Sequence, residues 1–158
     1  MRQLFENLLE AERELKKIDH IIYVTFPLLK DKNILIKSLV HTKEAVVKCI
    51  NSILQYEYFH NKIELSENPL INFRIFKEKC SRNYFIEEKE VKMIEELFDL
   101  AKSHKQSPME FIKDGKVIIL SDKMVKKTFT LEDVKRFLEM SKKVVEKTKG
   151  VFIKNSRN

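Results

Sequence analysis

Apolar residues recur at alternating steps of four and three over most of this chain, which is the spacing of one buried face of an α-helix. The first such stripe runs from Leu4 to Ile22, with Glu and Lys between its members. The chain has only two glycines and three prolines, so long regular elements are favoured over loops. At 158 residues it is long enough for one hydrophobic core. We therefore expect a single helical domain over residues 1–158.

Helix boundaries follow from residues that start or stop helices. The first helix is expected to end near Thr25, because Pro27 disfavours helical backbone before it. Thr130 and Asp133 resemble a capping box at the start of the last helix, and Gly150 is a plausible C-terminal cap. Asp31 and Asn68 can cap two of the others. The expected helices span about 4–25, 31–60, 69–80, 87–101 and 131–149.

The segment before the last helix has a different character. Two short β-branched runs, 109–113 and 116–120, are separated by Asp114-Gly115, which is a strong signal for a tight hairpin turn. Strand alternation places Phe111 and Lys113 on one face and Ile112 on the other. The predicted fold class is thus all-α, a four- to five-helix bundle with a small β-hairpin (about 109–121) inserted before the last helix.

Charge is distributed unevenly along the chain. The formal net charge is +7, and residues 1–104 carry 17 Lys+Arg and 17 Asp+Glu, whereas residues 105–158 carry 14 and 7. If these cations share a surface, they predict binding of RNA or another polyanion; a lysine-rich solvated surface is the equally weighted alternative. Few aromatic residues lie among these charges, so base stacking has little support. The candidate contact residues are Lys113, Lys116, Lys123, Lys126, Lys127, Lys135, Arg136, Lys142 and Lys143.

Other chemistries find little support in the sequence. Cys49 and Cys80 lie apart within helical segments and are expected to be reduced, buried thiols. Glu57 and His60 have the spacing of one half of a di-iron motif, but no second such pair exists, and we interpret them as a polar helix end. The chain has no glycine-rich phosphate loop, and its four histidines form no short paired motif. No metal or cofactor is expected.

Arg13 and His20 lie seven residues apart, so they share one face of the first helix. An Arg followed at short spacing by His, in a chain with this order of helices, resembles the HEPN ribonucleases. The resemblance implies that Arg13 would orient or stabilise a scissile phosphate and that His20 would act in proton transfer, with a homodimer bringing two such pairs together. A solvated arginine beside a helix-end histidine is the alternative that we favour.

Three functional hypotheses follow. The first is a noncatalytic binding or accessory protein that contacts RNA or another polyanion through its basic last third. The second is a HEPN-type metal-independent ribonuclease, and the third is a homodimeric protein-interaction module. A cytoplasmic location is expected, because no secretory signal is visible and the longest apolar stretch, 21–29, is too short to span a bilayer.

Overall fold

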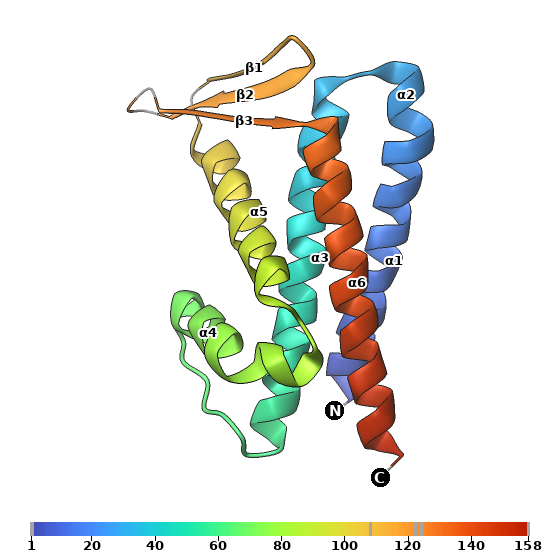
Figure 1. The fold of residues 1–158 in the computed structure, drawn as a ribbon, viewed down its shortest axis with the longest axis vertical. Coiled ribbons are helices and arrows are strands. Elements are labelled where there is room, and N and C mark those ends of the chain that lie inside the picture. The colour runs from blue at the N-terminus through green and yellow to red at the C-terminus, as the bar shows by residue number, and fades with distance from the viewer. Residues whose placement is uncertain (1, 108, 122, 124, 158) are drawn as a thin grey trace.

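The computed structural model describes residues 2–107, 109–121, 123 and 125–157, which are mostly helical (Figure 1). A small three-stranded antiparallel sheet precedes the last helix. Three long helices, α1, α3 and α6, pack side by side, and α5 lies against α3 and α6 (Figure 1). The elements are α1 (Arg2–His20), α2 (Phe26–Leu29), α3 (Lys32–Phe59), α4 (Pro69–Ile75), α5 (Glu88–Gln106), β1 (Met109–Lys113), β2 (Lys116–Leu120), β3 (Lys126–Thr130) and α6 (Leu131–Ser156).

Three of the expected helix starts are confirmed by their capping hydrogen bonds. The Asp31 carboxylate accepts from the backbone N–H of Asn33, and the Asn68 amide oxygen accepts from Leu70 N–H. At the start of α6, Thr130 Oγ1 accepts from Asp133 N–H, while the Asp133 carboxylate accepts from Thr130 N–H. Because such bonds lie within a few residues of sequence, local side-chain chemistry suffices to place these starts.

The first helix does not end near Thr25 as expected. A π-helical turn, Ile21–Thr25, follows α1 directly, and the chain continues as α2 up to Leu29. Pro27 lies in the first turn of α2, where its missing N–H costs little. The helical path ends instead at Lys30, whose backbone is left-handed with φ of 51°.

The last helix is also longer than the expected 131–149. Gly150 lies inside α6, which continues to Ser156, so it is no C-terminal cap. The reason is Phe152, which extends the buried stripe by another turn and is 1% exposed. Its ring packs on those of Tyr56 and Phe5, with centroids 4.6 and 5.3 Å away. This packing stabilises the last turns of the helix more than a single glycine weakens them.

The expected hairpin is present as β1 and β2, but it is part of a larger sheet. Residues 126–130, where the sequence analysis predicted no strand, form β3, which pairs antiparallel with β2. The Asp114-Gly115 turn has positive φ at both residues, 52° and 74°, as a type I′ turn requires. Phe129 of β3 pairs with Val117 and is 1% exposed, so burial of this ring accounts for the third strand.

Candidate nucleic-acid interface

The two faces of the sheet have different environments. Val117, Ile119 and Phe129 belong to the hydrophobic core, so the face that they share is the inner one. The strand register places Phe111, Ile118 and Thr128 together on the opposite face, which we call the outer face. Ile118 is buried, at 5% exposed, although it is not part of the main core cluster. The expected strand alternation is thereby confirmed.

Lysines lie at both ends of the outer face. Lys113 and Lys116 are exposed and directly opposite each other in the register, next to the turn. Lys126 is exposed at the other end, opposite Leu120 on β2. The two ends are four residue steps apart along β2, about 13 Å at about 3.3 Å per residue. Lys123, in the loop between β2 and β3, is exposed as well.

These four lysines form no ion pair with any residue that the structure describes. Placing two like charges directly opposite each other on a hairpin is unfavourable. An anion bound between them would offset this repulsion. Phe111, which lies between the two ends and is partly exposed, adds an aromatic ring to the same face. Met109 extends this apolar strip and is 56% exposed.

Four of the five remaining candidate cations have carboxylate partners, on α6 itself or on a neighbouring element. Lys127 pairs with Asp99 of α5, and Arg136 pairs with Glu96 of α5 at 3.2 Å. Lys135 lies 3.6 Å from Glu132 within α6. Carboxylates of the protein thus lie beside these three cations. Lys143 is exposed and has no ion-pair partner within 2–107, 109–121, 123 and 125–157.

Lys142 is the clearest example of a cation that connects α6 to another helix through an ion pair. Its ammonium group donates to Asp19 of α1 and, at 3.0 Å, to Glu139 of α6. Partial burial alone would lower the pKa of Lys142, but the two hydrogen-bonded carboxylates outweigh it and the pKa is raised above 10.5. The pKa of Arg136 is raised in the same way by Glu96 and Asp133, against the effect of burial. Both cations connect helices that are distant in the sequence.

Arg13 and His20 lie on the solvent-facing side of α1, and both are exposed. The inner side of α1 carries the buried stripe of Leu8, Ala11 and Leu15. Neither candidate catalytic residue has a side-chain hydrogen bond or ion pair to another described residue. The two therefore share a face, as their spacing predicts, and this face is turned toward solvent.

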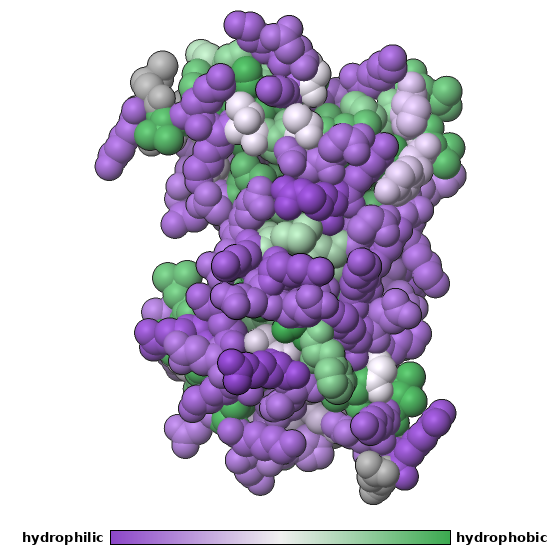
Figure 2. Space-filling view, in the orientation of Figure 1, coloured by the Kyte–Doolittle hydropathy of each residue, from purple (hydrophilic) through white to green (hydrophobic). Residues whose placement is uncertain are grey.

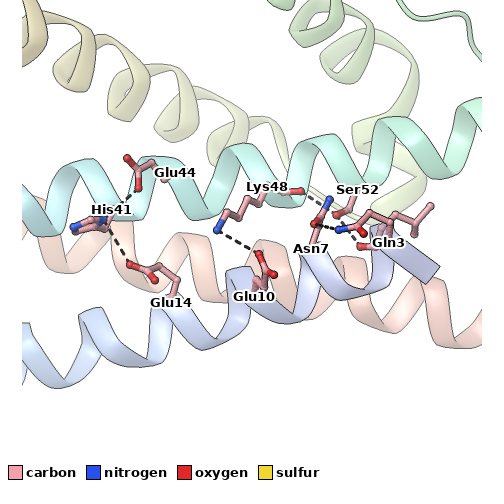
Figure 3. A network of polar contacts seen from close by, with 9 residues as sticks. Gln3, Asn7, Glu10, Glu14, His41, Glu44, Lys48 and Ser52 are labelled. Atoms are coloured by element: carbon pink, nitrogen blue, oxygen red, sulfur yellow. Dashed lines mark hydrogen bonds and ion pairs between the residues drawn. The ribbon is translucent and has the colours of Figure 1, made fainter. Parts of the chain in front are cut away.

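The four histidines lie in different surroundings. His41 lies between Glu14 and Glu44, 3.6 and 3.2 Å from their carboxylates, in the polar network that joins α1 and α3 (Figure 3). His104 lies 2.6 Å from Glu110 of β1. His60 packs on the Tyr56 ring, with centroids 4.4 Å apart. Among the residues described, no three His, Cys, Asp or Glu side chains are grouped so that they can hold a metal ion.

Our interpretation of Glu57 as part of a polar helix end is wrong. Glu57 is 5% exposed, and its carboxylate accepts a hydrogen bond of 2.8 Å from the Tyr84 hydroxyl. Burial and this carboxylate raise the pKa of Tyr84 above its usual range, so the phenol stays protonated and donates. The pair joins the end of α3 to the turn before α5. Its two members are 27 residues apart, so no local pattern indicates the contact.

Both cysteines are buried and free, as expected. Burial raises the pKa of Cys49 to about 12 and that of Cys80 to about 11. Since the thiolate is the reactive form, neither thiol is activated for nucleophilic chemistry at neutral pH.

Phe111 is a residue of the candidate interface that the sequence analysis did not include. Three aromatic residues that lie among or after the basic residues, Phe129, Phe137 and Phe152, are all at most 1% exposed and cannot stack on a base. Phe111 shares the outer face with Lys113 and Lys116, and strand alternation alone places it beside Lys113. The alternation of side chains along the strand could therefore have identified Phe111 as part of this face.

Comparisons of this sequence and structure with known proteins identified no similar protein. No family model matches this sequence, and neither a curated protein nor a solved structure is significantly similar to it. In the part of the chain that the structure describes, none of the helices has the length and apolarity needed to cross a lipid bilayer.

Proposed function

We propose that this protein is a noncatalytic RNA-binding protein that contacts single-stranded RNA with the outer face of its sheet. The observation that carries the proposal is the group of lysines at both ends of this face, Lys113, Lys116 and Lys126, with Phe111 between them. Lysines attract the phosphate backbone, and an exposed aromatic ring stacks on unpaired bases.

Ion pairs within the protein reduce the number of candidate cations that are available to bind RNA. Lys127, Lys135, Arg136 and Lys142 neutralise carboxylates of the protein itself, so a phosphate would have to compete with a partner already in place. The lysines on the outer face have no such competitor among the described residues. The proposed contact surface is therefore a small sheet face rather than the whole basic last third.

The first experiment reverses two charges on this face. We expect Lys113→Glu combined with Lys116→Glu to weaken binding of a short labelled oligouridylate about tenfold at low salt, as measured by fluorescence anisotropy. The melting temperature should hardly change, because both side chains are exposed. The matched control is Lys62→Glu combined with Lys79→Glu, two exposed lysines that change the net charge equally. Equal weakening in both double variants would show a nonspecific effect of net charge and contradict the proposal.

A second experiment separates RNA from other polyanions. Phe111→Leu keeps an apolar side chain on the outer face but removes the ring, so stacking worth about 1 kcal/mol or more is lost. We expect oligouridylate binding to weaken while retention on heparin, which has no bases, stays unchanged. If RNA and heparin respond equally to this variant, the face is a general polyanion site and the assignment to RNA is wrong.

A further inference from the structure

A second surface lies between α3, α4 and α5 and is independent of the proposed RNA contact. Two adjoining hollows of about 500 and 470 Å³ share Lys43 and Phe98 in their linings. We call them together the α3–α5 groove. In Figure 2 the molecule is hollowed at its left edge, in the region of α4 and α5. The larger hollow is mainly apolar, with Asn51 and Asn72 as further polar lining residues beside Lys43; its large apolar side chains are Val47, Ile50, Leu54, Leu70, Phe73 and Phe98.

The α3 side of the groove has the spacing of a helix-packing seam. Val40, Lys43, Val47, Ile50 and Leu54 line it, at alternating steps of three and four. This is the periodicity with which one helix contacts another. Leu70 of α4, which lines the larger hollow, is 80% exposed, so its side chain is open to a partner that enters there.

The far end of the groove, toward the sheet, is basic. Lys43, Lys102 and Lys105 line the second hollow, and none of them has an ion-pair partner within the described ranges. Glu44 lines the same hollow, but its carboxylate lies 3.2 Å from His41. The groove thus combines an apolar floor at one end with free cations at the other.

We infer that the α3–α5 groove binds an acidic amphipathic helix of a partner protein. The stretch of α3 from Val40 to Leu54 is about 21 Å long at about 1.5 Å per residue, which fits a helix of about four turns. Large apolar side chains of that helix would enter the hollow beside Leu70. Its carboxylates would face Lys43, Lys102 and Lys105. Grooves of this kind recognise helices through apolar anchors on one face.

A second copy of this chain is a poor occupant. Its most exposed apolar segment is at α2, where Leu28 and Leu29 are 81% and 66% exposed. Lys30, Asp31 and Lys32 follow, so this segment carries a net charge of +1, the same sign as the groove rim. Charge complementarity therefore favours a different, acidic partner.

The test uses a displayed library of amphipathic helices whose flanking positions are randomised among Asp, Glu, Lys and Arg. We expect selection on the full chain to enrich acidic helices. Leu70→Glu should weaken binding of a selected, labelled peptide at least about tenfold, because it puts a carboxylate at the apolar end. Leu28→Glu is the matched control, since that leucine is equally exposed at a different site. It should leave peptide binding unchanged.

Charge reversal at the rim gives a second readout. Lys102→Glu combined with Lys105→Glu should shift the selected helices from acidic to basic flanks, because both lysines are exposed and the fold does not depend on them. The inference would be overturned if the unaltered chain selected basic helices. It would also be overturned if the selected helices bound Leu70→Glu and Leu28→Glu equally well. A dimer in light scattering that Leu70→Glu converts to a monomer would overturn it as well, because the occupant would then be a second copy. Oligouridylate binding should be unaffected by Leu70→Glu, so this result and the proposed RNA contact can fail separately.

Discussion

Helix α6 and the three-stranded sheet share the excess positive charge of the chain, but their cations have different surroundings. On α6, Lys142 contacts Asp19 and Lys147 contacts Glu90, so the cations join this helix to α1 and α5. On the outer face of the sheet, Lys113 and Lys116 face each other across the hairpin. The same residue type thus stabilises the fold in one region and is available to an external anion in the other. A count of charges along the sequence cannot distinguish the two uses.

The largest expected effect is at the most buried ion pair of α6. Lys147 donates to the Glu90 carboxylate at 2.5 Å, and Glu90 is only 4% exposed. Lys147→Met keeps the aliphatic stem but leaves a buried carboxylate without its cation, so we expect a loss of about 2 kcal/mol or more in the free energy of unfolding. Urea denaturation measures it. Lys143→Met is the control and should change stability by less than about 0.5 kcal/mol. Similar small losses of unfolding free energy in both variants would show that Lys147 contributes no more than a solvated lysine, and would contradict this prediction.

The next effect concerns the turn that holds Lys113 and Lys116 together. Gly115 has a φ of +74° and open space where a Cβ would stand, so the cost of Gly115→Val is conformational, about 1 kcal/mol or more. RNA binding should fall with it. Gly150, inside α6, also has open space, and Gly150→Ala should instead stabilise the protein by up to about 1 kcal/mol. Thermal melts of both variants test the contrast. We expect the melting temperature to fall for Gly115→Val and to rise for Gly150→Ala. A lower melting temperature in both variants would contradict the prediction.

A smaller effect depends on pH. The pKa of Lys142 is raised in the folded protein, so its contribution to stability is fully present below its unfolded pKa of about 10.4 and is lost as the pH rises through the folded value. Since 34% of its side chain is exposed, we expect Lys142→Met to cost no more than about 1 kcal/mol at neutral pH. The difference from the unaltered protein should be constant from pH 7 to about pH 9 and shrink above about pH 10. A difference that grows with pH would contradict the assignment.

The smallest effect is expected at Arg13 and His20. Substituting them tests whether the protein binds RNA through the sheet or cleaves RNA with these two residues. Both side chains are exposed on α1, so Arg13→Ala and His20→Ala should change stability by less than about 0.5 kcal/mol. Oligouridylate binding should be unchanged. Gel analysis of a labelled RNA incubated with the unaltered protein and with His20→Ala completes the test. RNA cleavage that disappears in His20→Ala, in a protein that stays folded, would favour the ribonuclease hypothesis over the binding protein.

Local sequence determined much of this protein: the helical stripes, the caps at Asp31, Asn68 and Thr130, and the Asp114-Gly115 turn. Each depends on contacts within a few residues, which a sequence pattern records directly. It also determined which residues of β1 and β2 share a face, because alternation in a strand is a property of the backbone.

Only the tertiary structure decided which charges remain free. Lys142 and Asp19 are 123 residues apart, and Glu57 and Tyr84 are 27 apart, so no local pattern indicates that they meet. The added strand β3 and the continuation of α6 past Gly150 likewise depend on burying Phe129 and Phe152 among distant elements. Burial and ion pairing are energies of the folded packing, and a residue type that suits several surroundings acquires its role only there.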